Sequence, residues 1–201
     1  MKIGPKYKIA RRLGVPIFEK TQTQKYILST ERKMKNKRPR QKTDFGLQLL
    51  EKQKARMFYG ITERQFKNYV KKALSQKHAS PTIFLLAALE CRLDNVIWRV
   101  GLAPTHAAAR QMVSHGHMCV NGKKTKIPSF NVNIGDIISV REGSKQNKTF
   151  SDNVEKGIEK EIPVWLHFDS AKQAAEVKSK PKEIGKEMYF DLGQVIEFYQ
   201  R

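Results

Sequence analysis

The sequence has little cysteine, few acidic residues and no long apolar run, and each shortage narrows what the protein can be. Its two cysteines, Cys91 and Cys119, imply no disulfide framework, so a reducing compartment such as the cytoplasm is expected. No apolar stretch approaches the roughly 20 residues needed to cross a bilayer. The N-terminal residues also lack the apolar core of a secretory signal. We therefore expect a cytoplasmic protein without a membrane partner.

The shortage of acidic residues gives the chain a strongly positive charge. Its 201 residues include 39 lysines and arginines but only 19 aspartates and glutamates, for a formal net charge of +20 at pH 7. The isoelectric point is near 10.0. Such a balance indicates a polyanionic partner, most often nucleic acid.

Catalytic and cofactor motifs are also missing. The sequence has no Gly-rich phosphate loop, no Cys-x-x-Cys and no Gly-x-Ser-x-Gly. His115, His117 and Cys119 have strand-like spacing and offer metal-ligating atoms, but nothing nearby clearly supplies a fourth ligand. His167 and Asp169 also alternate, with no nucleophile tied to them. We therefore predict a protein that is not an enzyme and holds no cofactor or metal.

The chain is organised around residues 89–140, which predict a helix, a turn, a second helix and a hairpin. Apolar residues recur at steps of three and four and predict one continuous helical face at Leu86, Leu89, Leu93, Val96 and Val100. Gly101 is expected to cap this helix in the left-handed conformation, and Thr105 to cap the next one. Ala109, Met112 and Val113 then share one face, and Gly116 is placed to end the helix. Asn121-Gly122 predicts a type I′ hairpin.

The flanking regions complete an α+β fold with three parts. Residues 1–43 form a basic arm with sparse apolar residues, which is either a solvated disordered tail or an arm that orders only against phosphates; the charge favours the second. Residues 44–89 predict a helical domain, and residues 90–154 a module of two helices and a small antiparallel sheet. We expect residues 155–201 to include a short strand at 164–168 and a last amphipathic helix capped by Asp191.

Several local signals define the boundaries of these elements. Asp44 is expected to cap the first helix of the helical domain, and Thr62 with Gln65 has capping-box spacing. Ser80-Pro81 suits the start of a helix. The alternation of Phe130, Val132 and Ile134 predicts a strand, and that of Ile138 and Val140 another. Residues 141–161 are expected to form an exposed connection with some helix.

Four short blocks in the central stretch resemble the RNA-binding module called the S-four domain. They are Arg92-Leu93-Asp94, Ala109-Arg110-Gln111, Val113-Ser114-His115 and Val120-Asn121-Gly122. They occur in the order and at the spacing of that module. The module also occurs in pseudouridine synthases, in tyrosyl-tRNA synthetases and in a heat-shock RNA-binding protein, so by itself it leaves the function open.

The rest of the chain resembles the bacterial type of small-subunit ribosomal protein S-four. The matching segments are residues 42–56, 59–69 and 163–166, with Arg11-Arg12 and Arg38-Pro39-Arg40. The resemblance implies a primary rRNA-binding protein that nucleates assembly of the small-subunit body and contributes to translational accuracy. It also implies neighbours of the S-five and S-twelve families and a ribosome that is either bacterial or organellar. The same resemblance implies that residues 155–201 pack onto residues 44–89 and complete the helical domain, with the module as an insertion. The arm lacks the zinc-binding cysteines of some members and is short between Gln22 and Lys42.

The predicted RNA contacts combine cations with directional hydrogen-bonding groups. They are Lys2, Lys6, Lys8, Arg11, Arg12, Arg38, Arg40, Lys52, Lys54, Arg56, Arg64, Lys67, Arg92, Arg110, Gln111, Ser114, His115, Asn121, Lys123 and Lys124. Arg92 is equally compatible with a salt bridge, whereas Arg110 is expected outside the core with its fork turned to a phosphate. Tyr7, Phe18 and Tyr26 are compatible with base stacking and equally with core packing.

Two other functions would require different sequences. An RNA-modifying enzyme with an appended S-four domain should carry a catalytic aspartate in a large second domain, and too few residues lie outside the module to build one. A non-ribosomal RNA-binding chaperone would not need the segment from 42 to 76. A structural protein of the small ribosomal subunit is therefore the preferred hypothesis.

Overall fold

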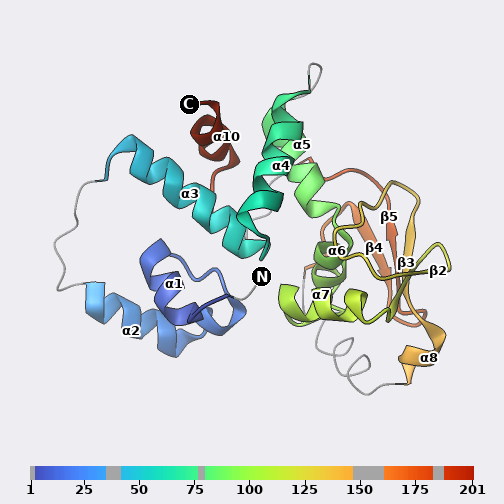
Figure 1. The fold of residues 1–201 in the computed structure, drawn as a ribbon. Coiled ribbons are helices and arrows are strands. Elements are labelled where there is room, and N and C mark those ends of the chain that lie inside the picture. Colours follow the sequence, from blue (N-terminus) through green and yellow to red (C-terminus); the bar gives the residue numbers. More distant parts are fainter. Residues whose placement is uncertain (1–2, 35–41, 77–79, 147–160, 183–187) are drawn as a thin grey trace. The chain divides into compact units, whose positions relative to one another are not determined.

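The protein, described here by a computed structural model over residues 3–34, 42–76, 80–146, 161–182 and 188–201, divides into two compact units (Figure 1). Unit 1 comprises residues 1–85 and 186–201, and unit 2 comprises residues 86–185. Unit 2 is therefore an insertion between two parts of unit 1. The predicted α+β class is confirmed. No helix in the described ranges is both long enough and apolar enough to span a membrane.

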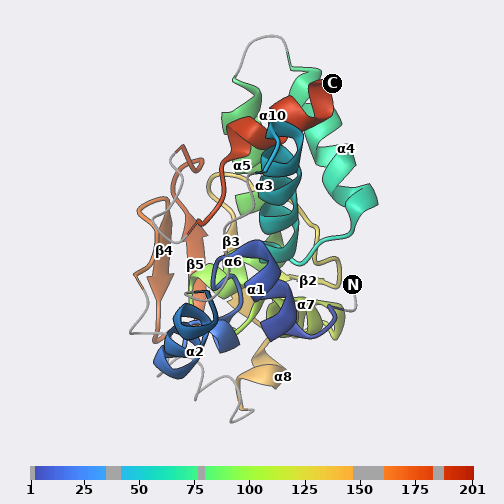
Figure 2. The same ribbon diagram turned by 90° about the vertical axis from the view of Figure 1, so that its left-hand side faces the viewer.

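Unit 1 is helical. Its elements are α1 (Lys6–Leu13), the 3-10 helix η1 (Glu19–Thr21), α2 (Gln24–Met34), α3 (Asp44–Phe58), α4 (Glu63–Leu74), the first part of α5 (Pro81–Glu90) and α10 (Leu192–Gln200). Helix α10 lies beside α3 and α4 (Figures 1 and 2). Residues 186–201 thus complete a core that begins more than a hundred residues earlier in the chain.

The core of unit 1 uses the stripe expected on α4. Phe66, Val70 and Ala73 are fully buried. An aromatic cluster joins the end of α3 to the segment before α10, with the Phe58 and Phe190 ring centroids 5.5 Å apart. The predicted capping box of Thr62 and Gln65 is confirmed, as is the Asp191 cap of α10. The predicted Asp44 cap is one residue too late, because Thr43 accepts the cap hydrogen bond from Gly46 N–H.

The prediction that the arm forms no regular structure by itself is wrong for residues 6–34. Helix α1 buries Ala10 and Leu13, and the turn after it buries Ile17 and Phe18. This apolar period spans too few residues to stand out in the sequence. It becomes a core because α1 packs against η1 and α3.

In unit 2, the single long helix expected from Leu86 to Val100 is two helices. Helix α5 ends at Glu90 and α6 (Leu93–Arg99) begins after a break at Arg92, whose backbone is extended. There, Val132 N–H donates to the carbonyl of Cys91. All five apolar residues of the expected face are nevertheless buried, so the periodicity located the core and missed the break.

The next helix of unit 2 begins and ends where the sequence predicts. Helix α7 (His106–Ser114) is capped by the Thr105 hydroxyl, which accepts from Ala108 N–H at 3.1 Å. Gly101 has φ of 79° and Gly116 has φ of 74°, the left-handed values expected where a helix ends. Helices α6 and α7 pack together and bury Ala109 and Val113.

A five-stranded antiparallel sheet forms the rest of unit 2. In the order β2-β1-β3-β5-β4, its strands are β2 (Lys123–Thr125), β1 (Met118–Val120), β3 (Ile137–Val140), β5 (Ala174–Val177) and β4 (Leu166–Asp169). The β1–β2 turn has φ of 50° at Asn121 and 74° at Gly122, as a type I′ turn requires. A short helix, α8 (Glu142–Lys145), follows β3.

Two predictions about this sheet are wrong. Residues 130–134 form no strand and make only an isolated bridge between Asn131 and Arg92, because this segment closes the α5–α6 break. Strands β4 and β5 belong to unit 2, although residues 155–201 were assigned to the helical domain. The reason is the pairing of β5 with β3, which ties residues 166–177 into the module's sheet.

Candidate RNA-binding surface

The end of α7 and strand β2 bring cations and hydrogen-bonding side chains together on unit 2. Lys124 lies over Gly116, since a β-carbon added to that glycine would fall 2.3 Å from Lys124 Cε and 3.4 Å from Lys126 Cε. Glycine at 116 therefore provides both the left-handed backbone that ends α7 and the space that Lys124 occupies. We define the α7-end face as the exposed residues Gln111, Ser114, His115, Lys124 and Lys126.

His117 links this face to the segment after β3. Its Nδ1 lies 3.0 Å from Ser144 Oγ, and its carbonyl accepts from Arg141 N–H at 2.8 Å. Burial lowers the pKa of His117, and the neighbouring charges of His115, Arg141 and Lys124 lower it further. Arg141 therefore lies close enough to add an exposed cation beside the α7-end face.

The contacts predicted from the sequence do not include two of the cations near this face, Lys126 and Arg141. Side chains alternate along a strand, so Lys124 and Lys126 point to one side while Lys123 points to the other. Lys123 is exposed but does not join the α7-end face. The period of two could have identified Lys126; nothing local could have identified Arg141, because the fold brings it beside His117.

Asp94 binds both predicted arginine contacts of the S-four module. The Arg92 Nη2 and Arg110 Nη2 atoms each lie 2.8 Å from Asp94 Oδ2, and both Nε atoms are 3.0 Å from this carboxylate. The Arg92 and Asp94 side chains are each only 3% exposed, whereas that of Arg110 is 26% exposed. The fork of Arg110 is therefore turned to Asp94 and not away from the module as the sequence predicts, and Arg92 forms the salt bridge that is its alternative to an RNA contact.

Replacing Arg110 with alanine should therefore reduce stability. Losing charge-assisted hydrogen bonds to Asp94 should cost about 1.5–3 kcal/mol of unfolding free energy. The slope of log rRNA affinity against log salt should stay unchanged, because the Arg110 fork is bound to Asp94. Urea denaturation and salt-dependent binding of the same variant measure both, with Gln111→Ala as the exposed neighbour control. Unchanged stability with a shallower slope would instead assign Arg110 to a phosphate.

Asn121 is also engaged within the fold. Its Nδ2 donates to Asp136 Oδ1 at 2.8 Å, and its Oδ1 accepts from Ile137 N–H at 2.9 Å. Both ends of the amide thus tie the β1–β2 turn to the turn before β3. The prediction that Asn121 offers its amide to RNA does not fit this geometry.

In unit 1, three predicted contacts on α3 are held by carboxylates. Lys52 is 8% exposed, and its Nζ lies 2.9 Å from Glu63 Oε1 and 4.4 Å from the Phe198 ring centroid. Lys54 pairs with Glu51 at 2.6 Å, and Arg56 Nε lies 3.6 Å from Glu63 Oε2. Lys52, Lys54 and Arg56 are therefore each engaged with a carboxylate of unit 1.

Arg64 and Lys67 on α4 are exposed, as predicted contacts should be. The equally exposed Lys71 follows at helical spacing and shares their side of α4, opposite the buried Phe66. Lys8, Arg11 and Arg12 are exposed on α1, while Lys6 lies over the Phe18 ring at 5.5 Å. Lys2, Arg38 and Arg40 lie outside the described residues.

The carboxylate of Glu63 binds side chains from two other helices of unit 1. Burial acts to raise its pKa, but hydrogen bonds from Lys52 and Tyr199 and the charges of Lys52 and Arg56 outweigh it, so the pKa lies below the usual 4.5. Tyr199 donates to Glu63 Oε1 at 2.7 Å, and burial followed by this hydrogen bond raises the pKa of the phenol. The carboxylate thus joins α10 to α3 and α4.

The lowered pKa of Glu63 predicts a loss of stability in acid. Its contribution is fully present above the unfolded-state pKa near 4.5 and disappears as the pH falls through the lower folded-state pKa. Glu63→Gln should therefore flatten the acid limb of a plot of unfolding free energy against pH. Urea titrations across that range measure it, with the exposed Glu142→Gln as control. An unchanged acid limb in Glu63→Gln would contradict the assignment.

No group of three histidine, cysteine or acidic residues in the described ranges has the geometry to hold a metal ion. The rings of His115 and His117 have centroids 6.1 Å apart, and Cys119 is buried in β1.

Comparisons with known proteins cover nearly the whole chain. The model described as the Ribosomal protein S4/S9 N-terminal domain matches residues 1–90, and the S4 domain model matches residues 91–138. A Small ribosomal subunit protein uS4 of Roseiflexus castenholzii is 44% identical over 204 residues, covering 99% of this chain and 98% of the relative. The chain belongs to the uS4 family. Relatives of the same name from Chloroflexus aurantiacus (39% over 206 residues) and a Sulfurihydrogenibium species (41% over 199 residues) cover at least 97% of both chains.

Membership in the uS4 family confirms the resemblance seen in the sequence. The S4 domain match falls on α6, α7 and the strands up to β3, which are the elements that carry the α7-end face. The first family model covers α1 to α5, which includes the exposed cations of α1 and α4.

Proposed function

We propose that this protein is a structural constituent of the small ribosomal subunit and binds its rRNA. The observation that supports this most directly is the uS4 family membership over nearly the full chain, with an S4 domain whose α7-end face gathers exposed cations and donors. Phosphate contacts need such a combination of charge and directional hydrogen bonds. The protein would act without catalysis, inside the ribosome in the cytoplasm.

The proposed contacts fall on three surfaces. On unit 2 they are the α7-end face and Arg141; on α4 they are Arg64, Lys67 and Lys71; on α1 they are Lys8, Arg11 and Arg12. All of these residues are exposed. Such spread-out cations suit a folded RNA read by shape and phosphate position.

We further propose that the protein binds rRNA early and alone, nucleates assembly of the subunit body and contributes to translational accuracy. Its protein neighbours would be the S-five and S-twelve proteins. A primary binder must recognise rRNA before other proteins shape it, and a net charge of +20 allows strong binding to free RNA.

Sedimentation tests the ribosomal role directly. The tagged protein should remain with small subunits through a high-salt sucrose gradient, and purified protein should bind small-subunit rRNA that carries no other protein. Loss of the protein from the subunit peak in high salt would contradict a structural role. Stable incorporation without binding to bare rRNA would contradict the primary-binder role alone.

A further inference from the structure

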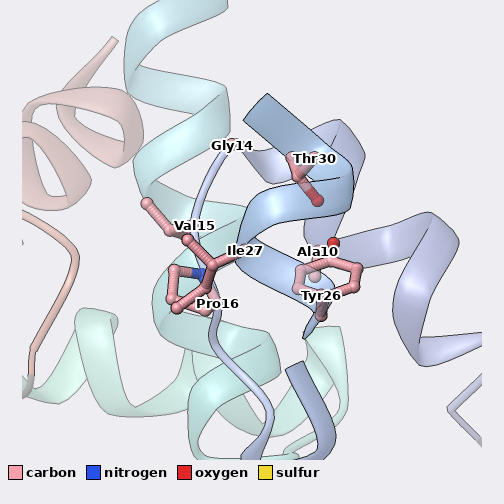
Figure 3. A pocket seen from close by; sticks show the side chains of 7 residues that line it. All are labelled: Ala10, Gly14, Val15, Pro16, Tyr26, Ile27 and Thr30. Atoms are coloured by element: carbon pink, nitrogen blue, oxygen red, sulfur yellow. The ribbon is translucent and has the colours of Figure 1, made fainter. Parts of the chain in front are cut away.

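Unit 1 contains a hollow between α1 and α2, close to the proposed rRNA contact Arg11. Its volume is about 230 Å³, and its walls come from the end of α1, the loop after it and one side of α2 (Figure 3). The lining residues are Ala10, Gly14, Val15, Pro16, Tyr26, Ile27 and Thr30. Pockets for drug-sized ligands are usually about 300–1,000 Å³, so this one suits a single ring system.

The walls are apolar, with one aromatic ring and one unused polar atom. Tyr26 forms a tilted aromatic pair with Tyr7, at 5.4 Å between ring centroids. Thr30 Oγ1 is buried and has no hydrogen-bond partner among the described residues. A buried hydroxyl without a partner is costly, which favours an occupant that carries a polar edge.

One cation lies next to Tyr26, a residue that lines the hollow. The Tyr7 carbonyl accepts from Tyr26 Oη at 3.2 Å and from Arg11 Nε at 3.3 Å, so the Arg11 guanidinium lies next to the Tyr26 hydroxyl. Arg11 is exposed. Residues 3–30 contain six lysines and arginines but only one acidic residue, Glu19.

We propose that this hollow receives one unstacked base of small-subunit rRNA. The base would lie against Tyr26 and the aliphatic walls, with its polar edge hydrogen-bonded to Thr30 and a flanking phosphate bound by Arg11. Protein recognition of single-stranded RNA uses this combination of aromatic surface, base-edge hydrogen bonds and cations. An apolar protein side chain would fill the hollow but would use neither the Thr30 hydroxyl nor the Arg11 guanidinium. The inference rests on the proposed rRNA binding.

Two substitutions test the pocket, each with a matched control on the same surface. Val15→Phe fills the hollow, and Leu28→Phe adds the same ring at an exposed α2 position that does not line it. Thr30→Val removes the buried hydroxyl at nearly constant shape, and Ser29→Ala removes an exposed hydroxyl one residue away. Thr30→Val should leave stability intact, because it removes a buried group that has no partner.

The measurement is binding of full-length protein to protein-free small-subunit rRNA, combined with chemical probing of base edges. Val15→Phe should weaken binding by about 5- to 150-fold, the range for losing one stacked base. Thr30→Val should weaken it by about 2- to 10-fold, as for one hydrogen bond. At saturating protein, one unpaired base protected by the wild type should react again in Val15→Phe, with the other protections retained. Leu28→Phe and Ser29→Ala should match the wild type.

Other results would overturn the proposal. Wild-type affinity and an unchanged footprint in both Val15→Phe and Thr30→Val would exclude a base from the hollow. Unchanged rRNA binding with poorer incorporation into subunits would assign the hollow to a side chain of another ribosomal protein. If Val15→Phe does not fold, Thr30→Val decides alone. Failure of the wild type to bind rRNA would instead refute the proposed function, so the two failures are distinguishable.

Discussion

Replacing Asp94 with alanine should lower the free energy of unfolding by about 3–5 kcal/mol, because it removes the carboxylate that binds the buried Arg92 guanidinium. Asp94 lies in unit 2 and is 2% exposed. Its carboxylate binds the 3% exposed Arg92 and the partly exposed Arg110. Urea denaturation monitored by circular dichroism measures the loss. Asp169→Ala is the control, since that aspartate is 36% exposed and its carboxylate binds the exposed side chain and the backbone N–H of Lys172.

A triple variant separates charge from packing. Arg92→Met/Asp94→Leu/Arg110→Met replaces the ionic cluster with apolar side chains of similar length and should recover much of the stability lost in Asp94→Ala. A loss below about 1 kcal/mol in Asp94→Ala would mean that the cluster is screened like a surface ion pair.

The second large effect concerns rRNA affinity. Removing three exposed cations in Lys124→Ala/Lys126→Ala/Arg141→Ala should make the slope of log affinity against log salt shallower by about 2–3, at about 0.7–0.9 for each phosphate contact. Stability should change little because these side chains are exposed. The pKa of His117 should rise in the same variant, because the charges of Arg141 and Lys124 help to lower it. Filter binding over a salt series and NMR titration of His117 measure the two effects.

A charge-matched control tests whether position matters. Lys172→Ala/Lys178→Ala/Lys182→Ala removes three exposed lysines of unit 2 that do not belong to the α7-end face. This variant should leave the slope of log affinity against log salt nearly unchanged. An equal decrease of the slope in both variants would show that overall charge governs binding, and the α7-end face would lose its special role.

The features that the sequence predicted correctly are those encoded within a few residues. The Thr62–Gln65 capping box, the Thr105 cap and the Asn121-Gly122 turn each depend on neighbours three residues away or fewer. A side-chain cap or a positive φ has few chemical solutions, so the residue types identify it.

Arg110 and Lys52 were misassigned because their acidic partners lie on other elements, whereas Lys54, which pairs with Glu51 three residues before it, could have been recognised locally. Asp94 and Arg110 are 16 residues apart, and Lys52 and Glu63 are 11 apart. A lysine or arginine has the same sequence pattern whether a carboxylate or a phosphate binds it. For Arg110 and Lys52, the carboxylate partner could therefore be identified only after the fold had placed the acidic residues.

The insertion of unit 2 into unit 1 imposes an order on synthesis. The ribosome makes α1 to α4, then all of residues 86–185, and only then α10. Until α10 emerges, Glu63 lacks Tyr199 and the Phe58 ring lacks Phe190. Unit 2 can close its sheet on the nascent chain while unit 1 still exposes apolar surface, and domains generally fold as units during translation. Unit 1 therefore matures second although its first helices are made first.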